Sequence, residues 1–251
     1  MSETLLSGRG VTKTFGALRA VWNFDFEVKR GEILGIIGPN GAGKTTVLSL
    51  INGTLPLTSG EIRFKGEKIS GLKPHRIAER GISRAFQVVK PFPGMTVLEN
   101  VSIGALFGKD KMKNAAAARE KTRSILAKVS LDGKENVKVE NLNISERKRL
   151  ELARALAMDP ELLLLDEVMA GCNQAEIKAI MDLIIELNRQ GRTIVLIEHV
   201  MKAIMGISHR IIVLHHGEKI SEGAPEAVIN DERVISAYLG ERYAKSRGKN
   251  A

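Results

Sequence analysis

Nine consecutive residues combine three glycines, a lysine and two threonines in the pattern G-x-x-x-x-G-K-[ST]. The pattern follows the apolar run Ile33–Ile37 and precedes residues 45–51, whose composition favours a helix. Glycines let the backbone turn tightly, so that several N–H groups and the positive end of the helix can attract one anion. We therefore predict a binding site for nucleoside triphosphate phosphates, formed by Gly38, Pro39, Asn40, Gly41, Ala42, Gly43, Lys44, Thr45 and Thr46. Lys44 is expected to reach the β- and γ-phosphates, and the Thr45 hydroxyl to coordinate magnesium.

Two adjacent carboxylates follow a second apolar run. Residues 162–165 are four leucines, which is typical of a strand buried on both faces, and Asp166 and Glu167 come directly after it. Open α/β sheets bind ligands at the carboxyl ends of their parallel strands. Asp166 is therefore predicted to bind magnesium, and Glu167 to orient and deprotonate an attacking water.

Two further polar residues also follow apolar segments. His199 comes after the run Thr193–Ile197 and Glu198, where it could hydrogen-bond a γ-phosphate, although a lone histidine after a strand is more often structural. Gln87 follows the short run 82–86, and by itself it resembles any surface glutamine. Neither residue would indicate a function alone.

Composition limits the class of protein. The chain has 251 residues, of which 43% are hydrophobic, enough for a core. It contains no run of about 18 apolar residues that could span a bilayer, and its first residues lack the pattern of a secretion signal. Its single cysteine, Cys172, excludes internal disulfides and cysteine metal pairs, so we expect a reducing compartment such as the cytosol.

The net charge of +9 comes partly from residues 109–128, with seven Lys/Arg against two acids, and partly from residues 242–249. A basic surface suits nucleic acid or anionic lipids, but it also arises from solvated helix faces. Aromatic residues are few, and none alternate with basic ones as in a base-stacking platform. Charge alone therefore does not indicate a nucleic-acid-binding protein.

The pattern of apolar residues predicts a mixed α/β fold. Trp22, Phe24, Phe26 and Val28 alternate as in a half-buried antiparallel strand, and residues 61–64 with the turn Lys65-Gly66 indicate a hairpin. Alternating strands and helices in the last part of the chain favour a parallel, doubly wound sheet. The predicted helices are residues 97–106, 114–129, 145–156, 175–189 and 200–205; the predicted later strands are residues 162–165, 193–197 and 211–214.

Taken in order, these motifs resemble those of the ATP-binding subunit of an ABC transporter, over essentially the whole chain. The set comprises the phosphate loop, Gln87, residues 142–146, the acidic pair and His199. Residues 81–87, 95–101, 197–202, 205–208 and 237–240 further resemble the subfamily of branched-chain amino acid importers. The resemblance implies one P-loop NTPase domain with a mostly parallel core sheet, an N-terminal antiparallel β subdomain and an inserted helical subdomain. The core with the β subdomain would comprise about residues 1–91 and 157–251, and the helical subdomain about residues 92–156.

The resemblance also implies roles for single residues, with ATP and Mg²⁺ as ligands. Phe15 matches the aromatic residue that stacks on adenine, and Gln87 the residue that contacts magnesium or water and relays the state of the site. Glu167 matches the catalytic base and His199 the switch histidine. Residues 170–173, the seam loop, match the loop that crosses the dimer interface.

One motif departs from the family pattern. The signature segment, residues 142–146, reads Leu-Asn-Ile-Ser-Glu in place of Leu-Ser-Gly-Gly-Gln. Asn143 and Ser145 are expected to contact the γ-phosphate of ATP bound to the other subunit, yet both glycines are absent, which disfavours close approach and any positive φ. Ser145 could itself cap the following helix and, with Arg147–Arg149, attract phosphate. Val168 replaces the usual proline, and Cys172 and Asn173 stand at seam positions that are usually leucine and often aspartate in the family.

The leading hypothesis is an importer ATPase that drives two permease subunits. A solute-binding protein would deliver the cargo to these permeases. The ATPase dimer would be a homodimer or include a related ATPase. The chain would be a peripheral subunit at the cytoplasmic face of the inner membrane. No nucleic acid is expected as a partner. The altered signature leaves open a nucleotide-gated subunit with very weak hydrolysis. The charge leaves open a soluble ABC ATPase that acts on nucleic acid, and the cargo could be an amino acid, urea or another amide.

Overall fold

The computed structural model describes residues 3–109, 111–112 and 114–239, and the chain forms two compact units. The first unit comprises Met1–Leu72 and Val195–Ala251, and the second comprises Lys73–Ile194. The basic residues 242–249 and Gly240 of the closing motif lie outside the described residues. The subdomain boundaries expected from the sequence stay a prediction.

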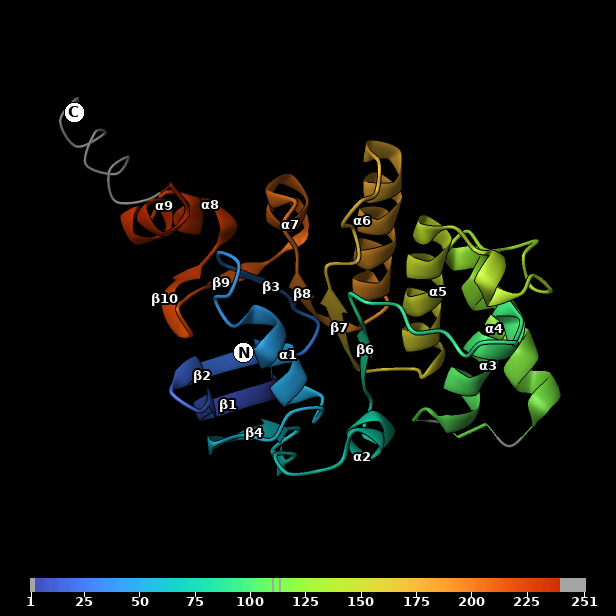
Figure 1. Cartoon of the computed structure of the whole chain (residues 1–251), viewed down its shortest axis with the longest axis horizontal. Coiled ribbons are helices and arrows are strands. Elements are labelled where there is room, and N and C mark those ends of the chain that lie inside the picture. Colours follow the sequence, from blue (N-terminus) through green and yellow to red (C-terminus); the bar gives the residue numbers. More distant parts are fainter. Residues whose placement is uncertain (1–2, 110, 113, 240–251) are drawn as a thin grey trace. The chain divides into compact units, whose positions relative to one another are not determined.

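The first unit contains a four-stranded antiparallel sheet in the order β2-β1-β4-β5 (Figure 1). Its strands are β1 (Thr4–Phe15), β2 (Leu18–Lys29), β4 (Ser59–Phe64) and β5 (Glu67–Lys68). The predicted hairpin is confirmed, since Lys65 and Gly66 join β4 to β5. Both residues have positive φ, 52° and 78°, as a two-residue type I′ turn requires.

The alternation predicted for β2 is correct for only part of the strand. Phe24, Phe26 and Val28 are buried, but Trp22 is 37% exposed and Val21 is fully buried in its place. Asn23 has a φ of +43°, and the register against β1 shifts in this stretch. Such a bulge moves the preceding side chains to the opposite face of the sheet, so the prediction for Trp22 was wrong.

A parallel pair of strands forms the centre of the first unit. β3 (Ile33–Ile37) runs parallel to β9 (Arg210–His215), and β10 (Glu218–Gly223) pairs antiparallel with β9. All five residues of β3 are buried, as expected for a strand covered on both faces. The helices of this unit are α1 (Lys44–Ile51), α7 (Met201–Ile207), α8 (Pro225–Ile229) and α9 (Glu232–Leu239).

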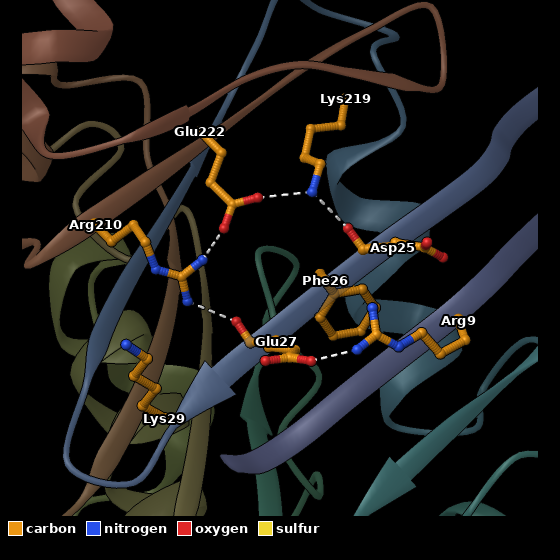
Figure 2. A pocket seen from close by; sticks show the side chains of 8 residues that line it. All are labelled: Arg9, Asp25, Phe26, Glu27, Lys29, Arg210, Lys219 and Glu222. Atoms are coloured by element: carbon orange, nitrogen blue, oxygen red, sulfur yellow. Dashed lines mark hydrogen bonds and ion pairs between the residues drawn. The ribbon is translucent and has the colours of Figure 1, made fainter. Parts of the chain in front are cut away.

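Paired charges connect the antiparallel sheet to β9 and β10. A hollow of about 330 Å³ has a lining that includes Arg210, Glu222 and Lys219 (Figure 2). The Arg210 guanidinium pairs with Glu222 and donates to the Glu27 carbonyl at 2.6 Å, and Lys219 donates to Glu222 at 2.7 Å and to the Asp25 carbonyl at 2.8 Å. Because these cations bind carboxylates and carbonyls of the chain itself, we interpret the hollow as a structural connection.

The second unit combines a parallel strand pair with helices. β6 (Ile82–Ala85) runs parallel to β7 (Leu162–Asp166), whose four leucines are fully buried as the sequence predicts. Helices α3 (Val97–Phe107), α4 (Ala115–Lys128) and α5 (Ile144–Ala157) pack on one another (Figure 1). The other elements are α2 (Pro74–Glu79), η1 (Val139–Asn141) and α6 (Gln174–Arg189). Strand β8 (Thr193–Ile197) carries the chain from this unit into the first.

The helices predicted for the middle of the chain are confirmed to within two residues at each end. Their first turns explain the boundaries. Asn114 precedes α4, and its side-chain oxygen accepts from the N–H groups of Ala116 and Ala117. Thr96 caps α3 and shares a reciprocal capping box with Glu99. Side chains that bind the free N–H groups of a first turn fix where each helix begins.

Candidate functional site

The phosphate loop lies in the first unit, between β3 and α1, and two of its glycines have no room for a side chain. Gly38 has a φ of +152°, and a Cβ there would lie 2.1 Å from the carbonyl oxygen of Leu214. Gly43 has a φ of +102°, and its Cβ would lie 2.3 Å from the carbonyl oxygen of Ala20. The loop path therefore depends on glycine at both positions, as the motif predicts.

Helix α1 begins at Lys44, and no side chain caps its first turn. Its N-cap, Gly43, has no side chain to cap it, and the described first turn contains no acidic residue. Uncapped N–H groups and the helix dipole favour a bound anion at this end. The loop therefore fits a phosphate ligand.

Lys44 is bound by carbonyl oxygens of its own loop. The residue is 6% exposed, and its ammonium group donates to the carbonyl oxygens of Gly38 at 2.8 Å and Pro39 at 3.0 Å. These bonds place the positive charge inside the loop, which is where the sequence predicts the β- and γ-phosphates. Thr45, the predicted magnesium ligand, is exposed. Among the remaining loop residues, Ala42 is buried, Pro39 and Thr46 are half-buried, and Asn40 and Gly41 are exposed.

Phe15 and His199, the other two predicted residues of the first unit, are both exposed. Phe15 ends β1 and is 47% exposed, which leaves ring surface for a stacked base, and the Lys13 ammonium lies 4.9 Å from its centroid. His199 follows β8 and the buried Glu198. Their assignments to adenine and to the γ-phosphate stay predictions.

The acidic pair lies in the second unit at the end of β7. Asp166 is 1% exposed, and Glu167 is 9% exposed with a φ of +53°, in the left-handed region that a glutamate rarely adopts. Strained backbone of this kind persists where neighbouring contacts stabilise it, often at functional sites. The Gln87 amide supplies one such contact, since it donates to the Glu167 carboxylate at 2.5 Å. The structure thus joins two of the predicted site residues directly.

Arg84 is a charged partner that the sequence analysis did not single out. It lies in β6, and its guanidinium donates to the Asp166 carboxylate at 2.5 Å with both side chains almost completely buried. It also lies 4.7 Å from the centre of the Phe86 ring. An arginine within a short apolar strand was the available signal, because a buried charge requires a partner.

The signature segment differs from the prediction in how its helix is capped. The cap of α5 is Asn143, whose side-chain oxygen accepts from the N–H of Glu146 at 2.9 Å while the Glu146 carboxylate accepts from the N–H of Asn143 at 3.0 Å. The suggestion that Ser145 caps the helix was therefore wrong. Ile144 and Ser145 lie in the first helical turn, where right-handed backbone suits any residue, so the absent glycines cause no conformational conflict here.

Glu176 joins the signature segment to the seam loop. Its carboxylate accepts from the Ser145 hydroxyl at 2.6 Å and pairs with Arg149 at 3.3 Å. The other carboxylate oxygen accepts from the N–H of Asn173, the cap of α6, at 3.0 Å. The Ser145 hydrogen bond, followed by that of the Asn173 backbone, lowers the pKa of Glu176. The spacing Asn-x-x-Glu predicts the cap but gives no sign of the contact with Ser145.

The predicted magnesium ligands have suitable chemistry. Thr45, Gln87 and Asp166 offer hydroxyl, amide and carboxylate oxygens, which Mg²⁺ prefers. Among the described residues, no group of three or more His, Cys, Asp or Glu side chains could bind a metal by itself. Thr45 lies in the first unit and Gln87 and Asp166 in the second, so their joint role as magnesium ligands stays a prediction.

Comparison with known families agrees with these motifs. The family model described as ABC transporter matches residues 21–170. The chain belongs to the ABC transporter ATP-binding cassettes. A second model, described as branched-chain amino acid ATP-binding cassette transporter, matches residues 218–244. The cassette is accordingly an ATPase of the ABC class with a P-loop NTPase fold.

Individual relatives cover almost the whole cassette. It is 40% identical, over 96% of its length and 100% of the relative, to the high-affinity branched-chain amino acid transport ATP-binding protein LivG of Escherichia coli. It is 32% identical, over 96% of its length and 99% of the relative, to the lipopolysaccharide export system ATP-binding protein LptB of Haemophilus influenzae. A dimeric ATP-binding cassette in a post-hydrolysis state with ADP and Pi has 28% identity and a TM-score of 0.81, covering 88% of this chain and 99% of that one.

The described part of the cassette contains no helix that is both long and apolar enough to cross a bilayer.

Proposed function

We propose that the cassette is the ATP-hydrolysing subunit of an importer for branched-chain amino acids. Two ATPase subunits, either two copies or one copy with a related ATPase, bind ATP between the phosphate loop of one and the signature segment of the other. Their closure moves two permease subunits, to which a solute-binding protein delivers the cargo. The cassette acts as a peripheral subunit at the cytoplasmic face of the membrane. The 40% identity to LivG supports this choice of cargo over that of LptB.

The contact between Gln87 and Glu167 carries the proposal for hydrolysis. Glu167 is 9% exposed, and its carboxylate is the group best suited to orient and deprotonate a water next to the γ-phosphate. Gln87 donates to that carboxylate at 2.5 Å, so a change in the segment after β6 alters the position of the base directly. This bond offers a physical link between the catalytic carboxylate and a permease bound near Gln87.

The remaining groups bind and position the nucleotide. Lys44 exchanges its bonds with the carbonyls of Gly38 and Pro39 for phosphate oxygens, and the first N–H groups of α1 bind the phosphates. Thr45, Gln87 and Asp166 would hold Mg²⁺, which when bound neutralises phosphate charge. Phe15 stacks on adenine, and His199 interacts with the γ-phosphate.

The assignment of Glu167 is tested by replacing it. Glu167→Gln should slow ATP hydrolysis by about 10²–10⁴-fold, because the amide cannot accept the proton of the water. Nucleotide affinity, measured by calorimetry, should stay close to that of the wild type. Unchanged turnover in the variant would exclude Glu167 as the base.

The transport assignment needs the complete assembly. The cassette reconstituted with the permease subunits and the solute-binding protein of its transporter should drive uptake of radiolabelled leucine, isoleucine or valine into ATP-loaded vesicles. Vesicles that contain Glu167→Gln serve as the control. Robust ATP-dependent uptake of an unrelated solute, with none of these three, would contradict the proposed cargo.

The altered signature supports a second candidate, a nucleotide-gated subunit with very weak hydrolysis. Ile144 replaces a glycine and is 78% exposed at the start of α5, where a side chain hinders the approach of the opposing phosphate. Single-turnover measurements with the permeases present separate the two candidates. Release of ATP over many minutes without formation of phosphate favours the gate, and phosphate formation on the time scale of transport favours the ATPase.

A further inference from the structure

Two segments that the proposed function places at the dimer interface contact each other within one subunit. The signature segment begins α5, and the seam loop leads into α6. Ser145 of the first segment and Asn173 of the second bind the two different oxygens of one carboxylate, that of Glu176. We propose that Glu176 is a positioning residue that connects the signature segment to the seam loop, so that both approach the ATP of the partner subunit as one body. This inference rests on the proposed function.

The contact depends on the departure from the family signature. Ser145 stands where the family pattern has its second glycine, and a glycine has no hydroxyl to donate. The bond from the Ser145 hydroxyl to Glu176, at 2.6 Å, therefore belongs to this version of the signature. A hydrogen bond to an ionised acceptor is stronger than one between neutral groups, so it can compensate for part of the positioning that the glycines otherwise allow.

Other contacts support the same connection. Arg149, one turn further along α5, pairs with the Glu176 oxygen that Ser145 binds, at 3.3 Å. Lys148 of α5 donates to the carbonyl oxygen of Ala170 in the seam loop. Three residues of the first two turns of α5, Ser145, Lys148 and Arg149, thus have partners in or beside the seam loop. Arg147 instead donates backward to the carbonyl oxygen of Leu142. A movement of α5 therefore moves the seam loop with it.

The cap of α6 makes Glu176 a precise connector. The Asn173 side chain accepts from the N–H of Glu176, and the Glu176 carboxylate accepts from the N–H of Asn173, both at 3.0 Å. This reciprocal box fixes the carboxylate relative to the last residue of the seam loop. Helix α3 begins with the same kind of capping box, formed by Thr96 and Glu99, but this box does not contact the seam loop. Glu99 therefore provides a matched control for substitutions of Glu176.

The test compares Glu176→Ala with Glu99→Ala, both in the Glu167→Gln background that retains ATP. MgATP-dependent dimer formation is followed by size-exclusion chromatography with light scattering, and ATP affinity of the monomer by calorimetry. Glu176→Ala should raise the ATP concentration needed for half-maximal dimerisation about 10-fold, the scale of a hydrogen bond to a charged group. Glu99→Ala should leave it unchanged, and neither variant should alter the affinity of the monomer, because both residues lie outside the phosphate loop.

Two further variants separate positioning from a loss of fold. Glu176→Gln retains an acceptor oxygen and should recover part of the dimerisation. Ser145→Ala removes the same bond from the other side and leaves the cap of α6 intact, so it should weaken dimerisation even if Glu176→Ala does not fold. Combined with Glu176→Ala, it should add little, because both changes remove one interaction.

Two results would overturn the inference, and they differ in what else they affect. The parent protein is the Glu167→Gln variant. This inference alone is overturned if the parent dimerises with MgATP and if Glu176→Ala and Ser145→Ala dimerise like Glu99→Ala. A parent that forms no MgATP-dependent dimer would overturn the proposed function and this inference with it.

Discussion

Two regions of the cassette depend on different kinds of interaction: the phosphate loop depends on its backbone, and the region of the acidic pair and the signature segment depends on side-chain pairs. In the loop, backbone conformation fixes the path of the chain. Gly38 and Gly43 have positive φ and approach carbonyl oxygens too closely for any Cβ. In the second region, pairs of side chains fix the geometry: Arg84 with Asp166, Gln87 with Glu167, and Ser145 with Glu176. A site built from backbone tolerates few substitutions, whereas one built from side-chain pairs can change if both partners change together.

The two regions also satisfy their charges differently. Lys44 donates to carbonyl oxygens of its own loop, which are neutral and can be exchanged for phosphate oxygens. Asp166 is bound by a buried cation of full charge, and that partner is more costly to displace. We therefore expect nucleotide binding to rearrange the loop lysine readily and to leave the pair of Arg84 and Asp166 in place.

The largest expected effect concerns that buried pair. Arg84→Met should lower the free energy of unfolding by about 3–5 kcal/mol, because the Asp166 carboxylate is left buried without its partner. Urea denaturation measures the change. The double variant Arg84→Met/Asp166→Asn, which removes both charges, should recover much of the loss. If the single variant were as stable as the wild type, side-chain pairing would not be what stabilises this region.

A smaller effect is expected from the loop backbone. Gly38→Ala should cost about 3 kcal/mol, since it combines an unfavourable φ with a contact against Leu214. It should also weaken ATP binding, which calorimetry detects. Gly41→Ala is the matched control: Gly41 has a φ of +79° but no atom within 4 Å of its Cβ position among the described neighbours, so it should cost only about 1–2 kcal/mol. Equal losses in both variants would show that close packing at Gly38 is unimportant.

The smallest effect is a dependence on pH. The Ser145 hydroxyl, followed by the Asn173 backbone, lowers the pKa of Glu176 in the folded protein. A carboxyl whose folded pKa is lowered stabilises the fold above its unfolded pKa, and this contribution is lost as the pH falls through the folded value. Glu176→Gln should therefore reduce the melting temperature at pH 7 and make less difference well below pH of about 4.3, the ordinary pKa of glutamate. A difference that is constant with pH would contradict an ionised Glu176.

The opposite sign is expected for a glutamate of the neighbouring element α5. Burial raises the pKa of Glu151 in α5, although Arg154 acts against this effect. Its contribution to stability is therefore present at low pH and is lost as the pH rises through its folded pKa. Glu151→Gln provides a reference for the measurement on Glu176, because the change should relieve a cost at neutral pH.

Local features of the chain could be predicted from the sequence, and contacts between distant residues could not. The phosphate loop, the buried leucines of β7 and the boundaries of α3 to α6 depend on neighbouring residues, and the structure contains these elements. Trp22 was misplaced because the bulge at Asn23 has no clear sequence signal. From the sequence Ser145 could cap α5, but the cap is Asn143, which with Glu146 three residues later has the spacing of a capping box.

By itself, the sequence determined the family and the chemistry, because glycine spacing, strand ends and paired acids act over a few residues. Only the tertiary structure showed that Arg84 binds Asp166, 82 positions away, and that Ser145 binds Glu176, 31 positions away. The physical reason is that a hydrogen bond depends on a distance in space and on desolvation, and both are set by how β6, β7, α5 and α6 pack. In this cassette, the packing of α5 and α6 brings Ser145 of the altered signature segment into contact with Glu176.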